Sequence, residues 1–145
     1  MWFFNKRLIS KSDEIRLIKA IQLAELKTSG EVRVHLAKRC KTDALTECKF
    51  YFKKLNMHLT KGQNGILLYL SADSKAFAVW GGQGIHDKVT DAFWENIKNC
   101  SIDLFKQDNM IEGLEAAIHE CGEQLKTYFP ISHNDVNELP NDISY

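Results

Sequence analysis

Two carboxylates and a histidine near the middle of the chain are the side chains whose types and spacing could do chemistry together. Asp87 and Asp91 stand four residues apart, and His86 precedes them just after the run Gly81-Gly82-Gln83-Gly84. On the first turn of a helix, residues four apart project from the same face. Neighbouring carboxylates repel each other, and hard divalent cations such as Ca²⁺ and Mg²⁺ neutralise them by binding carboxylate and carbonyl oxygens. The spacing therefore predicts a divalent-metal site at a helix start.

Two other interpretations of this segment stay open. Acidic residues in a first helical turn often serve only as partners of the helix dipole. A glycine loop before a helix can also cradle a phosphate. This loop lacks the GxGxxG and GxxxxGK spacings of nucleotide-binding loops, and no EF-hand pattern is present.

The elements that must position these residues are three strands. Alternating apolar and polar residues predict a strand over 31–36, with Glu31, Arg33 and His35 on its polar face. Two apolar runs, 66–70 and 76–80, are joined by a short polar turn and predict a buried antiparallel pair. Apolar residues at helical spacing also predict four helices. The first begins at Ser12, the second is capped by Asp43, the third runs from about 87–91 to Phe105, and the fourth runs from Ile111 to Tyr128.

The order α–β–α–β–β–α–α predicts an α/β fold: an αβα sandwich around a mixed sheet, with helices on both faces. We expect residues 1–145 to form a single domain, with 1–11 as an N-terminal lead. The tail, 131–145, is polar, and two alternatives stay open for it: residues 142–145 add a short edge strand as a fourth strand, or the tail is mobile.

Strand direction brings distant loops together. The first two strands are expected to start, and the third to end, at the same edge of the sheet. Glu31 and Asn64 would then lie beside the glycine loop and the two aspartates. Asn64 would add a neutral oxygen to the carboxylates. His35 is expected to be a hydrogen-bonded, partly buried histidine, and His58 has no partner at metal-ligand spacing.

Composition excludes several other classes of function. Nineteen basic and nineteen acidic residues balance, so net charge gives no argument for nucleic-acid or anionic-membrane binding. The longest apolar run is too short for a transmembrane segment. The chain shows no export signal, which predicts a cytoplasmic location. The four cysteines form no CxxC pair, so free thiols are expected rather than structural zinc. Trp2, Phe3 and Phe4 are expected to pack on the domain, with membrane association as the alternative.

Several ordered motifs resemble the TPM domain family. They span 28–35 (TSGEVRVH), 64–70 (NGILLYL), 81–88 with Phe93-Trp94, 112–114 and 122–125, and 137–140 (NELP) is similar to the ending of short, stand-alone bacterial members. The resemblance implies an αβα sandwich around a four-stranded mixed sheet and divalent metal binding near the converging loops. Calcium is the usual candidate in the family, with Mg²⁺ and Zn²⁺ as others. Plant relatives are credited with acid phosphatase activity.

The resemblance also bears on individual residues. His86 stands where exported members carry an acid, and Asp91 matches an acidic position shared across the family. The expected metal ligands are therefore Glu31, Asn64, His86, Asp87 and Asp91. We expect a metal-binding regulatory or interaction domain with an unidentified protein partner. The alternative is a metal-assisted phosphatase acting on phosphomonoesters, for which the sequence identifies no catalytic residue.

Overall fold

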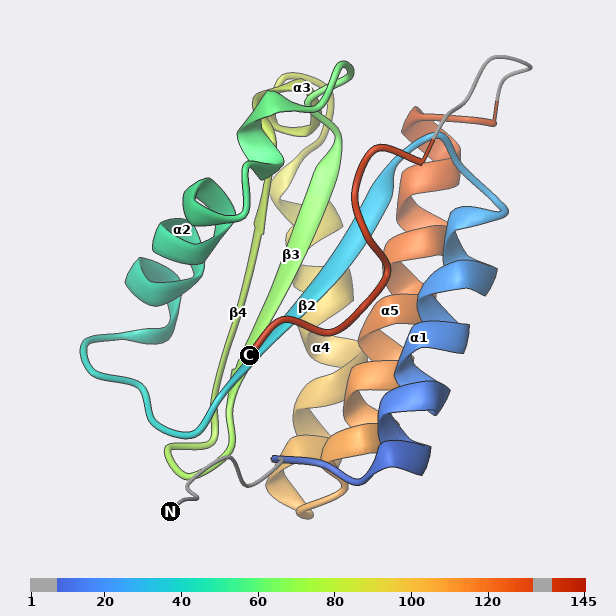
Figure 1. Ribbon diagram of the computed structural model, residues 1–145. Helices are drawn as coiled ribbons and strands as arrows, with labels where there is room; N and C mark the ends of the chain where they lie inside the picture. Colours follow the sequence, from blue (N-terminus) through green and yellow to red (C-terminus); the bar gives the residue numbers. More distant parts are fainter. Residues whose placement is uncertain (1–7, 132–136) are drawn as a thin grey trace.

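A three-stranded mixed sheet lies between helices in the computed structural model, which describes residues 8–131 and 137–145 (Figure 1). Strands β2 (Glu31–Ala37), β3 (Gly65–Ser71) and β4 (Ala76–Gly81) lie in the order β2-β3-β4. β2 runs parallel to β3, and β4 runs antiparallel to β3. The three predicted strands are confirmed, with ends displaced by no more than one residue.

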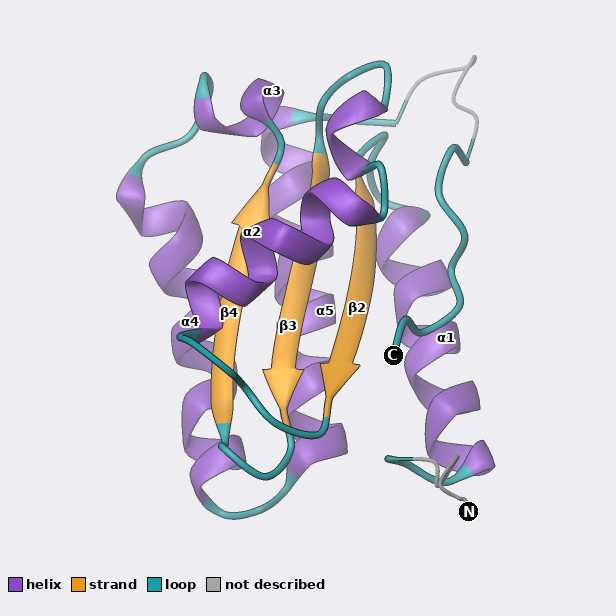
Figure 2. Cartoon of the chain, turned by 60° about the vertical axis from the view of Figure 1, so that its left-hand side comes forward, coloured by secondary structure: helices purple, strands orange, loops and turns teal. Residues whose placement is uncertain are grey.

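Helices cover both faces of this sheet, which confirms the predicted α/β architecture (Figure 2). Helix α2 (Ala44–Lys54) lies on one face, followed by the 3₁₀ turn η1 (Met57–Leu59). On the other face lie three helices, with α5 packed between its two neighbours: α1 (Lys11–Glu25), α4 (Asp91–Lys106) and α5 (Met110–Tyr128).

The sheet is buried on both faces because each face has its own core. Val34 of β2 and Leu68 of β3 pack with the three-helix side. Leu67 and Tyr69 of β3 pack instead with Phe52 of α2. Burying each large apolar side chain contributes about 1.5–3 kcal/mol. Apolar coverage on both faces explains why β3 is almost continuously apolar. β2 alternates instead between apolar and polar residues.

The helix starts differ in part from the predicted ones. Ser10, rather than Ser12, caps α1, since its Oγ accepts the N–H of Asp13 at 3.1 Å. Asp43 caps α2 as predicted. The third predicted helix is confirmed as α4, which begins at Asp91 after the extended backbone of Thr90. A single helical turn that was not predicted, α3 (Gln83–His86), forms within the glycine loop.

The predicted fourth strand is wrong, because the tail adds only one bridge to the sheet. The N–H of Leu36 donates to the carbonyl of Ser144, and the N–H of Ser144 donates to the carbonyl of Val34, both at 2.9 Å. Upstream, Pro140 has no N–H to offer a ladder. The tail backbone therefore cannot extend this pairing into a strand.

The tail instead supplies partners to the polar face of β2. Figure 1 shows it crossing in front of that strand. The three polar side chains of β2 are buried, and each contacts the tail: Glu31 with Leu139, Arg33 with Asp142, and His35 with Ser144. The hydrogen-bonded environment predicted for His35 is thus confirmed, although its ring is only 1% exposed.

The remaining expectations concern the chain as a whole. All four cysteines are free thiols, as predicted. Within residues 8–131 and 137–145, no helix combines the length and apolar character that a bilayer crossing requires. Trp2, Phe3 and Phe4 lie outside the described residues.

Candidate functional site

The three loops predicted to converge do meet at one end of the sheet. The N–H of Glu31 donates to the carbonyl of Asn64 at 3.3 Å. The N–H of Gly82 donates to the carbonyl of Gly65, and the N–H of Gly84 donates to that of Gln63, both at 3.0 Å. Segments far apart in the sequence therefore form one hydrogen-bonded cluster, called here the loop cluster, comprising residues 30–31, 62–65 and 81–86.

Glycine is needed in this cluster for close approach of two backbones. A Cβ atom on Gly82 would lie 2.1 Å from the carbonyl oxygen of Gln63, and one on Gly84 would lie 2.3 Å from that of Gly62. The backbone of Gln63 has a φ of 47°, which lies in the left-handed region that residues other than glycine rarely adopt. Such a conformation costs on the order of 1 kcal/mol and persists only where its surroundings hold it.

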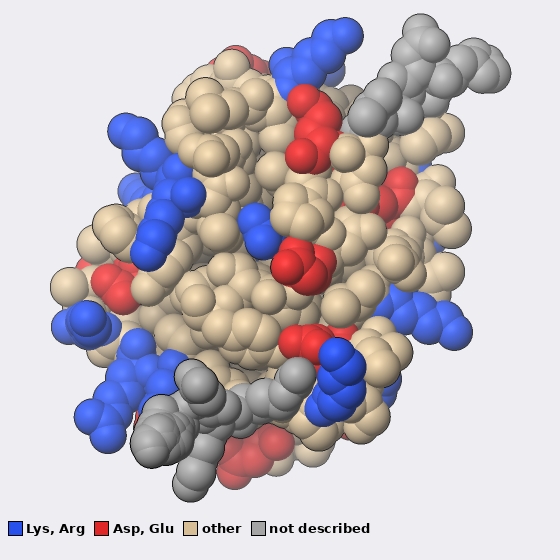
Figure 3. Space-filling model, viewed as in Figure 1, with Lys and Arg blue, Asp and Glu red and all other residues tan. Residues whose placement is uncertain are grey.

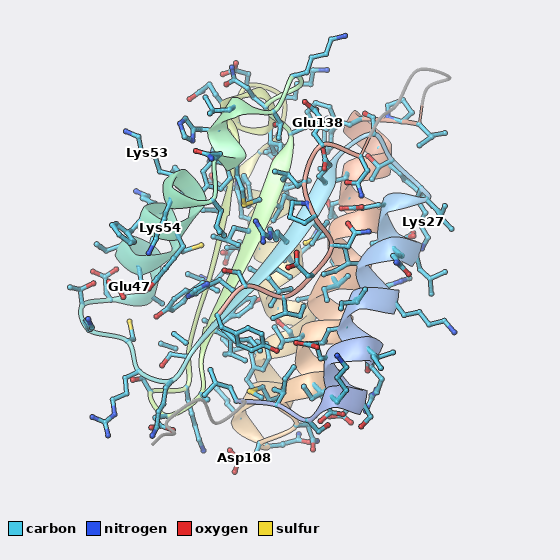
Figure 4. All side chains as sticks on the ribbon, in the orientation of Figure 1. Lys27, Glu47, Lys53, Lys54, Asp108 and Glu138 are labelled. Carbon is cyan, nitrogen blue, oxygen red and sulfur yellow. The ribbon has the colours of Figure 1, made fainter. Side chains whose placement is uncertain are left out.

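Glu31 lies in the cluster, but its carboxylate faces the tail. Oε1 of Glu31 accepts the N–H of Leu139 at 2.6 Å, and the side chain is buried. Burial raises the pKa of Glu31, and hydrogen bonds from the N–H groups of Leu139 and Glu138 oppose that rise. Glu138 in turn accepts the N–H of Lys61 at 3.1 Å, where the tail passes the loop end of the sheet (Figure 4). The carboxylate of Glu31 is thus committed to anchoring the tail.

Asn64 and His86 both take part in packing and hydrogen bonding within the domain. Asn64 is buried, and its backbone carbonyl binds Glu31. The His86 ring lies between two indoles, 4.6 Å from Trp80 and 5.0 Å from Trp94. Its Nε2 is buried with no hydrogen-bond partner among the described residues. The His86 ring therefore belongs to an aromatic cluster with the two indoles and forms no metal-ligand group with the two aspartates.

Asp87 and Asp91 are exposed at the two ends of the turn between α3 and α4. The prediction that they share one helical turn is wrong, because Asp87 ends α3 and the extended backbone of Thr90 separates it from α4. Asp87 accepts a hydrogen bond from Nε2 of Gln83 at 2.8 Å. Asp91 occupies the first turn of α4, whose N-cap, Thr90, makes no side-chain capping bond. Lys88 lies between them in the sequence, but its ammonium is 4.6 Å from the ring centre of Phe129.

The expected metal ligands do not form a single group. Within the described ranges, no three or more His, Cys, Asp or Glu side chains are gathered so that they could hold a metal ion. Glu31 does not suit a hard cation because its carboxylate is buried and bonded to the tail, and His86 does not because imidazole is not a ligand that such cations prefer. Asp87 and Asp91 do suit one, together with backbone carbonyls of their turn.

A second feature beside the loop cluster was not found from the sequence. An open hollow of about 320 Å³, called here the α2–α3 hollow, lies against α2, η1 and α3. Its polar lining comes from four separate elements and includes Lys49, Lys53, His58, Gln63, Gln83 and His86. The sequence singled out His86 and the glycine loop that contains Gln83. Lys49 and Lys53 are four apart on α2, but no short-range spacing connects them to the residues of the other elements.

These features define a class of protein: an α/β domain with a mixed sheet and a polar loop cluster where its two parallel strands begin. The chain belongs to the TPM domain family, whose model matches residues 4–124. It is similar to the BA42 protein from the psychrophilic bacterium Bizionia argentinensis, with 39% identity, a TM-score of 0.90 and coverage of 97% of each chain.

Two further solved structures share the fold at lower identity. The N-terminal domain of cg2496 protein from Corynebacterium glutamicum is 18% identical with a TM-score of 0.65, covering 90% of this chain and 85% of that one. An N-terminal domain from P. gingivalis is 19% identical with a TM-score of 0.69, covering 88% and 83%. No curated protein sequence matches the chain.

Proposed function

We propose that this chain is a regulatory or interaction domain in which a divalent cation, with calcium the first candidate, stabilises the turn between α3 and α4. Asp87 and Asp91 would hold the cation, and its charge would offset the repulsion between their carboxylates. The observation that carries the proposal is the exposure of both carboxylates on one short turn that is attached to the loop cluster.

Backbone groups of the same turn support the proposal. In the described part of the chain, no backbone N–H donates to the carbonyls of Asp87, Lys88 or Val89. Ca²⁺ takes six to eight oxygens and readily combines carboxylates with carbonyls and water. Two carboxylates are few for such a site, so we expect weak binding, on the order of millimolar.

Occupancy of this turn would affect a wider surface. The turn joins α3, which carries His86, to α4, which carries Trp94, and the two rings are in contact. A cation that holds the turn would restrict the motion of both rings. This is a route by which metal could control a partner-binding surface.

The test is a calcium titration followed by amide NMR spectra, with Asp91→Asn and a matched control, Asp103→Asn, on the same helix. We expect saturable shifts confined to residues 86–92 in the unmodified chain and in D103N, and their loss in D91N. Absence of saturable shifts at millimolar calcium, or identical shifts in D91N, would contradict the proposal. Magnesium and zinc titrations identify which cation is preferred.

The alternative function, a metal-assisted phosphatase, stays a prediction with less support. A metal pair that activates water needs several ligands around it. The described residues hold no group of three or more side chains of the ligand types. Hydrolysis of a phosphomonoester that depends on added metal and is lost in D91N would favour it.

A further inference from the structure

We propose that the α2–α3 hollow binds the oxyanion group, carboxylate or phosphate, of a small organic molecule. This site is separate from the proposed cation turn. The fold brings two histidines, two lysines and an aromatic wall to this one hollow.

Two histidines from different elements line the hollow, and each has one ring nitrogen without a partner among the described residues. Nδ1 of His58 and Nε2 of His86 are buried, and neither has a hydrogen-bond partner among the described residues. Both residues line the same hollow, although they are 28 positions apart. An unpartnered polar nitrogen is unfavourable, and an imidazole turned toward the hollow in its N–H form would donate to a bound oxyanion.

The charged residues of the hollow have one sign. Lys49 and Lys53 line it, and no acidic side chain is among its lining residues. Lys53 extends from the end of α2 that adjoins η1 (Figure 4), and basic side chains are visible over α2 in the surface view (Figure 3). The carboxylate of Asp87 bonds the amide of Gln83 but does not itself line the hollow. A negative ligand is therefore favoured over a cation.

Aromatic side chains indicate that the ligand has an apolar part. Trp80 and Phe52 form an apolar wall of the hollow, and Nζ of Lys49 lies 4.3 Å from the ring centre of Trp80. A volume of about 320 Å³ is at the small end for ligand sites. This size and lining fit a small aromatic or otherwise flat organic acid better than a large cofactor.

A transition metal bound by the two imidazoles is the rival explanation. Such a metal would need a third protein ligand or open positions filled by water. No further His, Cys, Asp or Glu lines the hollow, and two ammonium groups would repel the ion. The same lysines would attract an oxyanion, so the charge arrangement separates the two explanations.

The test compares three probes of similar shape by amide NMR titration in the presence of a chelator: benzoate, phenyl phosphate and the neutral benzyl alcohol. We expect at least one of the two anions to give saturable shifts at the Trp80 indole and at Gly81-Gly82. Benzyl alcohol should bind about tenfold more weakly or worse, because it lacks the charge that strengthens each hydrogen bond. The stronger of the two anions identifies the oxyanion.

Matched variants locate the binding. Lys53→Gln and His58→Gln should each weaken the anion about tenfold. Lys19→Gln, on α1 at the other face of the sheet, should leave it unchanged. K53Q alters an exposed side chain and keeps the test valid if H58Q fails to fold. Equal binding of benzyl alcohol, no saturable shift with either anion, or undiminished affinity in K53Q would overturn the proposal. So would a zinc titration without chelator that saturates at both histidines and excludes the anion.

Discussion

The buried polar face of β2 can be tested through the pH dependence of folding when His35 is replaced by Gln. The His35 ring is stacked 3.7 Å from that of Tyr51, and its Nδ1 is 2.9 Å from Oγ of Ser144. Gln keeps a group that can hydrogen-bond Ser144 but cannot titrate. The substitution thus removes the charge change while retaining polarity at this position.

The expected magnitude follows from the pKa of His35. Burial lowers this pKa from 6.5 to about 4, and the positive charges of Lys54 and Arg33 lower it further in the same direction. Between these two pH values the unfolded chain binds a proton that the folded protein does not. Folding stability from neutral His35 is therefore present above pH 6.5 and is lost as the pH falls to about 4. The loss corresponds to about 3 kcal/mol.

Glu25 produces the opposite slope in almost the same pH range. Burial raises its pKa from 4.5 to about 7, while a hydrogen bond from the N–H of Val32 opposes the rise. The folded protein here binds the extra proton, so stability is present below pH 4.5 and is lost as the pH rises to about 7. Because Glu25 is only partly buried, solvent screening reduces this contribution to about 1–2 kcal/mol.

The assay is urea unfolding followed by tryptophan fluorescence at several pH values, for the unmodified chain, His35→Gln, Glu25→Gln and the control His119→Gln on the exposed side of α5. The free energy of unfolding of H35Q relative to the unmodified chain should rise by about 3 kcal/mol as the pH falls from 6.5 to about 4. Relative to the same chain, E25Q should gain stability as the pH rises from 4.5 to about 7. H119Q controls for the general effect of replacing a histidine by Gln.

The measurement that decides is the difference in unfolding free energy between each variant and the unmodified chain, because the contributions of His35 and Glu25 to the pH dependence partly cancel in the unmodified protein. A pH-independent difference between H35Q and the unmodified chain would refute the argument. That result would mean that His35 binds its proton equally well in the folded and unfolded states, and that the tail leaves the ring open to water.

Other predictions concern the tail and the glycines of the loop cluster. Glu31→Ala leaves the N–H of Leu139 without its acceptor and should cost about 1–3 kcal/mol, measured by urea unfolding, with faster amide exchange at Leu139. Calcium shifts should persist in E31A, and their loss would show that Glu31 belongs to the cation site. Gly82→Ala should cost about 3 kcal/mol or more, because its Cβ meets the backbone of Gln63. Gly65→Ala, whose Cβ would meet nothing nearer than 3.4 Å, should change stability by no more than about 1 kcal/mol; equal losses would contradict the close-approach argument.

Much of the fold could be predicted because its signals are local. Alternation along 31–36 and the apolar runs on either side of the turn after Ser71 located all three strands. The direction of these strands then predicted that the loops near Glu31, Asn64 and Gly82 meet, and hydrogen bonds confirm it. The failed fourth strand shows the limit of such signals, since a short polar tail containing Pro140 carries no strong strand pattern.

The carboxylates of the predicted metal site show a second limit. Strand direction places the backbone of Glu31 at the loop cluster but leaves the orientation of its carboxylate undetermined. That orientation depends on Leu139, which is 108 positions away in the sequence. Asp91 begins α4 as its predicted helix start required, whereas Asp87 ends α3, a helical turn that the sequence did not predict.

The sequence by itself therefore determined the strand directions, the convergence of the loops and the resemblance to the TPM domain family, because periodicity and neighbouring residues encode these features. Only the tertiary structure decided which polar groups share a site. It directed Glu31 to the tail, separated it from Asp87 and Asp91, and brought His58, Lys53 and His86 to one hollow. The physical reason is that a side chain takes the partner available in space, and partners contributed by other elements leave no spacing in the sequence.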